Sequence, residues 1–409
     1  MILTLLERYL KNKFHFELDE ENKDSFTHHQ RREQLIEMYK ASENRPQSLK
    51  SALLLEILEN GIKTNIFDKN VFIEYLKNPL KNWYMNKKYQ NTRELNDNVW
   101  AQYTNNIQNR KNGQINRNQD RKLYKRYLEE FYESNPEENF DEFKEFFDKN
   151  FLVDLLEEFE YLSGKELKKE KTDLKRFETL SNKVLIDLLE CNQDVFKTDE
   201  RVKIVANIKN VSSLHIKIFE FNSENYYRKN LAPFRSNVDL DGLVTAFQKE
   251  YKYDKLPQQK FREVFEFEEL DNRVGLFVIE FISNGYSSRA VIKKGTLSLI
   301  FQSTVKGQIC YILDENQRIC QGENTGLWYQ NIYHKANEKN GKIIIPYAKI
   351  ETTDKVILVN ERFAQLSEFR RRSESYTFDA SYIVNHESLL MGKEADILIN
   401  PILKVNDRK

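Results

Sequence analysis

Residues 201–211 read RVKIVANIKNV, a short run of β-branched and apolar residues that leads into an asparagine-containing turn. Comparable runs recur down to the carboxyl end, and turn signals such as Asn284-Gly285 and Asn340-Gly341 separate them. This pattern is typical of antiparallel β-sandwiches. Strands are expected at 202–208, 214–221, 264–267, 276–282, 290–292, 297–301, 309–313, 343–345, 356–359, 376–384 and 395–403.

Glycine usage changes near Cys191. Only three of the twelve glycines precede it, and long segments of helical periodicity occupy that first half. Since helix interiors exclude glycine and strand turns favour it, the chain is expected to be a multidomain α+β protein. The prediction is an all-helical domain at 1–192 followed by two antiparallel β-sandwich domains at 193–295 and 296–409.

Helices are expected at 25–41, 48–61, 68–78, 139–162 and about 170–190. Gly61 is interpreted as the residue that ends the second of these. A stripe of phenylalanine and leucine supports the helix at 139–162, and a leucine-rich stripe that continues to Leu188 supports the last one.

Two adjacent segments of the helical half carry opposite charge. Residues 81–126 hold eleven Lys or Arg against three acids and are interleaved with aromatic side chains, whereas residues 129–160 hold thirteen acids against two lysines. Cations among aromatics can bind single-stranded nucleic acid. The favoured interpretation is that the acidic segment neutralises the basic one. The candidate binding residues are Lys87, Lys88, Trp100, Arg121, Lys122 and Arg126.

A family resemblance covers about half of the chain. It rests on residues 201–211, 214–222, 225–228, 275–285 and 288–292. These segments resemble the amino-terminal macroglobulin-like β-sandwich modules of alpha-macroglobulin-like proteins, including very large members of that group. Residues 305–315 and 341–347 resemble the adjoining module. The resemblance implies that 193–295 and 296–409 are consecutive β-sandwiches of macroglobulin or immunoglobulin type. It also implies that the chain is the amino-terminal part of a larger architecture.

The thioester chemistry of alpha-macroglobulins does not carry over. The nearest string, ICQGEN at 319–324, has Glu323 where the thioester requires glutamine, and it lacks the flanking glycine. No glycine-rich phosphate loop, Gly-x-Ser-x-Gly motif or zinc-helix spacing occurs in the sequence. No catalytic residue, cofactor or metal is therefore expected.

Three cysteines leave at least one thiol unpaired, which favours a reducing compartment, and pairing of Cys310 with Cys320 stays open. Glu7 and Arg8 interrupt the first apolar run too early for a signal peptide, and no run is long enough for a membrane span. The chain is expected to be cytoplasmic. Its 64 basic and 64 acidic side chains give no global field toward nucleic acid or membranes.

These observations favour a non-enzymatic interaction or scaffold protein with a protein partner. The alternative is a nucleic-acid-binding protein that uses residues 81–126. The sequence leaves the partner's identity and the oligomeric state open.

Overall fold

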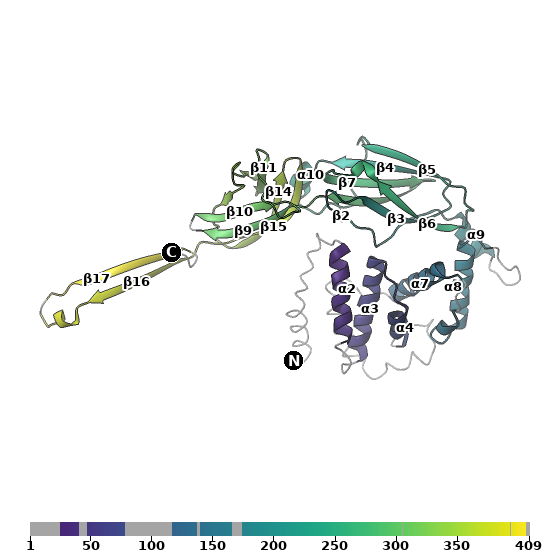
Figure 1. The fold of residues 1–409 in the computed structure, drawn as a ribbon, viewed down its shortest axis with the longest axis horizontal. Helices are drawn as coiled ribbons and strands as arrows, with labels where there is room; N and C mark the ends of the chain where they lie inside the picture. Colours follow the sequence, from purple (N-terminus) through teal and green to yellow (C-terminus); the bar gives the residue numbers. More distant parts are fainter. Residues whose placement is uncertain are drawn as a thin grey trace.

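A helical amino-terminal region is followed by antiparallel β-sheets in the computed structural model, so the expected fold class is confirmed (Figure 1). The structure describes residues 25–40, 47–77, 117–136, 140–165, 174–304, 306–392 and 394–405. The helices of the first region are α2 (Ser25–Lys40), α3 (Gln47–Thr64), α4 (Lys69–Lys77), α7 (Arg117–Ser134), the short 3-10 helix η3 (Phe140–Phe143), α8 (Lys149–Leu162) and α9 (Leu174–Asn182).

Aromatic side chains fill the core between α3, α4, α7 and α8. The Tyr127 ring stacks on the Phe72 ring with the two centroids 5.1 Å apart, and it packs edge-on against Phe67 at a centroid distance of 5.0 Å. Phe72 and Tyr127 are both fully buried. The Tyr127 hydroxyl donates a hydrogen bond to the Leu58 carbonyl of α3 at 2.9 Å. Large rings bury much apolar area, and this hydroxyl finds a partner, so α7 is held firmly against α3.

The expected end of a helix at Gly61 is wrong, because α3 continues to Thr64. Gly61 lies where a Cβ atom would stand 2.4 Å from the Tyr127 hydroxyl oxygen and 2.7 Å from the Ile66 carbonyl oxygen. The glycine is therefore required by two close approaches, that of Tyr127 from α7 and that of the turn that follows α3.

The single helix expected at 139–162 is also wrong, because η3 and α8 are separate. Asp148 is the N-cap of α8, and its carboxylate accepts hydrogen bonds from the backbone N–H groups of Asn150 and Phe151. A side-chain cap of this kind starts a new helix and interrupts the apolar stripe that runs through both segments.

The helix expected at 170–190 ends early. α9 stops at Asn182, and Leu185–Leu188 form strand β1, which pairs with β3 (Val202–Lys209) so that Ile186 lies opposite Ile208. The buried Lys209 ammonium donates to the carbonyls of Leu180 and Ser181 in the last turn of α9. This contact satisfies carbonyls that a longer helix would have bonded internally.

The first β-sandwich packs two sheets around one core. One sheet has the order β1-β3-β6 and the other β2-β8-β7-β4-β5, with all neighbours antiparallel except β2 and β8. The core joins Ile204 of β3 to Phe277 and Phe281 of β7. The remaining bounds are β2 (Val195–Phe196), β4 (Ser213–Phe221), β5 (Phe247–Lys252), β6 (Lys260–Phe267), β7 (Gly275–Ser283) and β8 (Tyr286–Lys294), with helix α10 (Ser223–Asn230) and the 3-10 helix η4 (Glu268–Leu270).

The second β-sandwich has sheets of order β13-β10-β9 and β12-β11-β14-β15. Ile312, Val356 and Leu358 lie in its core. Cys310 and Cys320 are buried here and both are free thiols, so the pairing left open by the sequence is absent. The strands are β9 (Ser298–Thr304), β10 (Gly307–Leu313), β11 (Thr325–Tyr329), β12 (Ile332–Lys335), β13 (Ile343–Ile345), β14 (Thr352–Asn360) and β15 (Phe363–Arg371).

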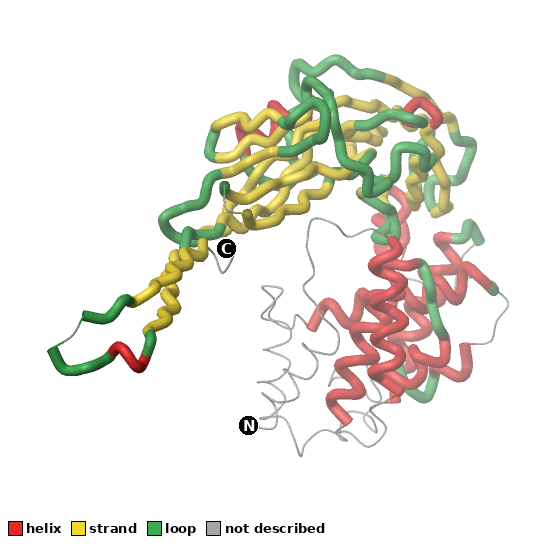
Figure 2. Tube along the Cα trace, turned by 60° about the vertical axis from the view of Figure 1, so that its left-hand side comes forward, coloured by secondary structure: helices red, strands yellow, loops and turns green. Residues whose placement is uncertain are grey.

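A two-stranded sheet follows the second sandwich and extends away from it (Figures 1 and 2). It consists of β16 (Tyr376–Val384) and β17 (Ile397–Val405), joined by a segment that contains the 3-10 helix η5 (His386–Ser388). The strands expected at 376–384 and 395–403 are these two. The domain divisions after residues 192 and 295 stay predictions.

Candidate interaction surface

Helix α7 turns one face toward the aromatic core and carries charged side chains on the other. Tyr124 and Leu128 are fully buried, whereas Arg121 and Lys122 are exposed. The amphipathic pattern fixes this orientation, because the buried residues recur at intervals of three and four. Residues 117–126 are the described portion of the basic segment and form the first half of α7, where Arg121 and Lys122 are exposed.

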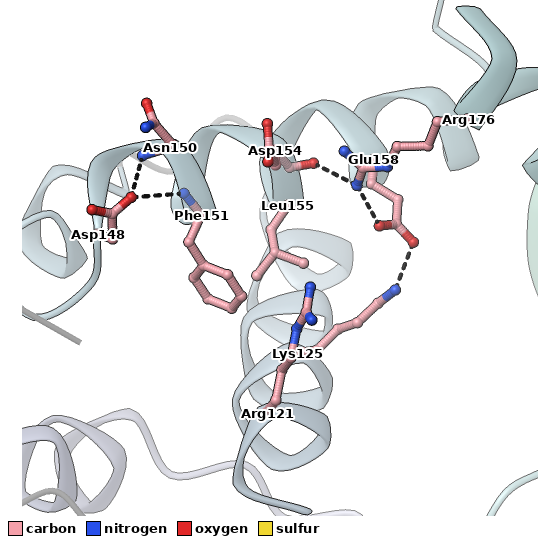
Figure 3. Close-up of a pocket in the computed structure, with 9 residues that line it drawn as sticks. All are labelled: Arg121, Lys125, Asp148, Asn150, Phe151, Asp154, Leu155, Glu158 and Arg176. Atoms are coloured by element: carbon pink, nitrogen blue, oxygen red, sulfur yellow. Dashed lines mark hydrogen bonds and ion pairs between the residues drawn. The ribbon is translucent and has the colours of Figure 1, made fainter. Parts of the chain in front are cut away.

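A cleft of about 420 Å³ lies between α7, α8 and α9 (Figure 3). Phe151 and Leu155 supply its apolar part, and the rest of its lining is charged or polar. The Arg121 guanidinium lies 5.6 Å from the centroid of the Phe151 ring, a cation–π distance. The other lining residues are Lys125, Asp148, Asn150, Asp154, Glu158 and Arg176.

Glu158 lies at the centre of the charges in this cleft. Its side chain is 10% exposed and accepts from Lys125 Nζ at 2.5 Å and from Arg176 Nη2 at 3.0 Å. Burial alone would raise the pKa of Glu158, but Lys125 and Arg176 outweigh it and lower that pKa below its usual value. Three helices are thereby joined through one carboxylate.

The structure places the candidate binding residues unequally. Arg121 and Lys122 lie on the exposed face of α7, and Arg126 is held on the next turn. Arg126 pairs with Glu129 at 3.8 Å and Glu130 at 3.4 Å. The expected neutralisation is present at Lys125 and Arg126. The candidates Lys87, Lys88 and Trp100 lie outside the described residues.

Ion pairs fix the carboxyl-terminal half of α7 to the first sandwich. Arg262 of β6 donates to both carboxylate oxygens of Glu130, at 3.0 and 2.8 Å, and to Glu133 at 3.0 Å. Lys260 donates to Glu129 at 2.7 Å. A bidentate arginine fixes orientation as well as distance, so the exposed face of α7 has a defined position relative to the sandwich.

Helix α10 joins the two sandwiches, and the sequence analysis missed it. Asn222 caps it by accepting from Asn225 N–H. Glu224 in its first turn accepts from the Trp328 indole at 2.8 Å, and Arg228 in its last turn lies 3.8 Å from the Trp328 ring centroid. An acidic first turn and a basic last turn after an asparagine are signals of a helix, so this one was detectable.

The junction between the sandwiches is a packed core of its own. Strand β7 turns Phe277 inward, whereas Leu276 and Val278 contact this junction core together with Ile357 and Val359 of β14. β7 is therefore buried on both faces along nearly its whole length, and β14 is buried on both faces from Val356 to Val359. This explains why residues 276–282 and 356–359 are nearly continuous apolar runs.

In the described residues, no group of three or more His, Cys, Asp or Glu side chains is arranged to hold a metal ion. None of the helices described has the length and apolar character needed to cross a membrane.

Comparison with known proteins matches the chain to two family models, the first on the helical region and the second on the first sandwich. Residues 2–184 match the actin-binding protein F N-terminal domain. Residues 214–295, within the first sandwich, match the AbpF first immunoglobulin-like domain. The chain is similar to actin-binding protein F. The protein of that name from Dictyostelium discoideum is 27% identical over 377 residues, which cover 89% of this chain and 16% of that relative's length.

Two solved structures of Escherichia coli alpha-2-macroglobulin are also similar. The one spanning domains MG0-NIE-MG1 has a TM-score of 0.30 at 8% identity and covers 45% of this chain and 64% of that chain. The one spanning NIE-MG1 has a TM-score of 0.29 at 12% identity and covers 46% of this chain and 98% of that chain. The macroglobulin resemblance implied a β-sandwich, and the match of residues 214–295 to an immunoglobulin-like domain agrees with that class. The sequence relative, however, is actin-binding protein F.

Proposed function

We propose that this chain is a non-enzymatic interaction module that binds actin filaments in the cytoplasm. The observation that carries the proposal is the match to two successive models of actin-binding protein F, one on the helical region and one on the first sandwich. The relative's name states that it binds actin, and its similarity extends over 89% of this chain. The macroglobulin resemblance bears only on the fold of the two β-sandwiches and not on the proposed binding.

The exposed face of α7 is the proposed contact. Lys122 is exposed there, and Arg121 lies beside it above Phe151. The ion pairs of Arg262 with Glu130 and Glu133 support this assignment, because they hold α7 in one orientation and so reduce the entropy lost on binding. The pairing of Lys125 and Arg126 with nearby acids favours a protein partner over nucleic acid.

Cosedimentation with filamentous actin tests the proposal. The intact chain is expected to pellet with filaments and to be released as salt rises, because exposed charges are screened. A Lys122→Glu variant should bind more weakly. Lys252→Glu is the matched control, since it reverses one exposed lysine on β5, which belongs to the other sheet from the β6 strand that contacts α7.

Failure of the intact chain to pellet with filaments at low salt would refute the proposed binding to actin filaments. Equal binding by Lys122→Glu and the control would refute the assignment to α7. Recovery of nucleic acid from a nuclease-sensitive, salt-labile complex would favour the alternative that uses residues 81–126.

A further inference from the structure

The two connections between the parts of the chain differ in kind. The first and second sandwiches share the junction core, whereas the apolar core of the helical region and that of the first sandwich have no described residue in common. Polar and charged groups instead connect the helical region to the β1-β3-β6 sheet. Figure 1 shows the helical region beside the first sandwich, with α9 leading from one to the other.

The outer face of the β1-β3-β6 sheet carries these contacts. Lys209 and Asn207 alternate with the core residues of β3, and they lie opposite Lys260 and Arg262 of β6 on the outer face. Lys209 and Asn207 are only 3% and 1% exposed, although they point away from the sandwich core. Since Lys209 bonds to α9 and Arg262 to α7, the helical region covers this end of the sheet.

The connection from α9 to β1 is the first of two attachments. The Lys209 ammonium donates to the carbonyls of Ser181 at 3.2 Å and Lys183 at 2.5 Å, at the carboxyl end of α9. Helix α9 also packs against α8, since the rings of Phe177 and Tyr161 lie 4.9 Å apart. Only two residues separate the end of α9 from the start of β1. This attachment is therefore short and shielded from water, and it can act as a pivot.

The second attachment is the α7–β6 contact, which consists of Lys260 and Arg262 of β6 with Glu129, Glu130 and Glu133 of α7. Its ion pairs are 2.7–3.5 Å long, and its side chains are 9–35% exposed. Taking such charges out of water costs free energy that offsets much of their mutual attraction. The closed contact is therefore only moderately more stable than the separated, hydrated charges.

We propose that the helical region and the first sandwich are joined by a salt-sensitive hinge. In the closed form the α7–β6 contact is made, and in the open form it is broken and the helical region turns away from the sheet about the α9–β1 connection. Raised salt favours the open form, because ions screen the attraction between α7 and β6 and stabilise the separated charges. The second sandwich stays fixed to the first, since the core between them is apolar.

Opening changes the surface that the chain presents. Glu129, Glu130 and Glu133 lie on one stripe of α7, because their positions differ by one, three and four. Separation from β6 uncovers this acidic stripe. It also frees the face of α7 that carries Arg121 and Lys122 from its fixed position relative to the sandwich.

Cys191 is a native reporter of opening. Its thiol is half-buried, and burial raises its pKa, while the nearby Arg126 and Arg262 act in the opposite direction. The thiol thus lies close to the α7–β6 contact and becomes accessible when that contact opens. Alkylation of Cys191, measured by mass spectrometry of its peptide, should be at least about fivefold faster at about 0.5 M than at about 0.05 M NaCl. The buried Cys310 and Cys320 are internal controls and should react slowly at both.

Arg262→Gln removes the side chain that holds two of the carboxylates. Cys191 should then react roughly tenfold faster at low salt, as expected when charge-assisted hydrogen bonds are lost. Loss of the arginine charge alone would raise the pKa of Cys191 further and slow the reaction, so faster labelling reports opening.

Lys203→Gln is the matched control. Lys203 lies on the same outer face of β3, and its partner Glu266, at 2.8 Å, belongs to the same sheet. This variant also loses one positive charge, but it leaves the α7–β6 contact in place. Its Cys191 should react at the rate of the native chain.

Two measurements distinguish opening from unfolding. Small-angle X-ray scattering of the intact chain should give a larger radius of gyration at raised salt and in Arg262→Gln, while hydrogen exchange in peptides of β7 should stay unchanged. Labelling of Cys191 that responds neither to salt nor to Arg262→Gln would overturn the proposal, and so would equal acceleration in Lys203→Gln. Faster exchange in β7 would also overturn it, because the sandwich itself would then be unfolding. The inference does not rest on actin binding, and these experiments contain no actin.

Discussion

Replacement of Glu158 by glutamine should loosen the α7–α8–α9 packing. In the native chain this carboxylate is 10% exposed and accepts from both Lys125 and Arg176. Hydrogen bonds to charged groups contribute roughly 1.5–3 kcal/mol each when buried. The Lys125 and Arg176 side chains are 39% and 34% exposed, so solvent screens both interactions and reduces their contribution. Since glutamine can still accept one hydrogen bond, the expected loss is about 2 kcal/mol.

Hydrogen exchange measured on peptides of α8 is the assay, because it reports local opening rather than unfolding of the whole multidomain chain. A loss of 2 kcal/mol corresponds to exchange roughly 30-fold faster at neutral pH. Asp154→Asn is the control. Asp154 is exposed on the same helix, and only its backbone carbonyl accepts from Arg176. The free energy of local opening of α8, derived from exchange, should therefore change by less than about 0.5 kcal/mol in this variant.

The pH dependence gives a second check. The pKa of Glu158 is lowered in the folded chain, so its stabilisation is present above the unfolded pKa of about 4.3 and is lost as pH falls through the folded pKa. The native chain and Glu158→Gln should therefore become alike in acid. A difference that is absent at neutral pH, or that persists unchanged below the folded pKa, would refute the reasoning.

Two further predictions concern the cores. Gly61→Ala should destabilise the helical region by about 1–2 kcal/mol, measured by urea unfolding. The clash of the new Cβ with Tyr127 and Ile66 costs more than the ~1 kcal/mol that alanine gains over glycine in a helix. A variant more stable than the native chain would contradict this prediction. Burial raises the pKa of Cys310 to about 12. Burial and, to a smaller extent, the nearby Asp314 raise the pKa of Cys320 to about 11. Both thiols should therefore resist alkylation in the folded chain at neutral pH and react after denaturation. Mass spectrometry of labelled peptides measures this, and rapid native labelling of either thiol would contradict it.

Periodicity and turn signals were enough to predict the fold class. The period-2 run at 202–208 and the apolar run at 276–282 became β3 and β7, since their local preference agrees with their place in the sandwich. The errors arose where a tertiary contact or cap overrides a local signal. Gly61 serves a close approach to Tyr127, and Asp148 caps a new helix within an apolar stripe.

The candidate surface was only partly predictable. The charge patterns of residues 81–126 and 129–160 indicated pairing, and Glu158 with Lys125 is an example of it. The contacts of Arg262 with Glu130 join residues 132 positions apart, and no short-range pattern encodes such a separation. Strand β15 (Phe363–Arg371) was missed because polar and charged residues are mixed with its apolar ones.

The junction core of Leu276, Val278, Ile357 and Val359 has a mechanical consequence. Modules joined by a bare linker swing independently, and a pull on one reaches the next only after the slack is taken up. Here the two sandwiches share buried apolar surface. Helix α10 directly follows β4 of the first sandwich and bonds to the second, through Glu224 with the Trp328 indole and through the Ala364 N–H, which donates to the Ser223 hydroxyl. The two sandwiches should therefore move as one body under tension, and a pull on the first reaches the second without slack at this joint.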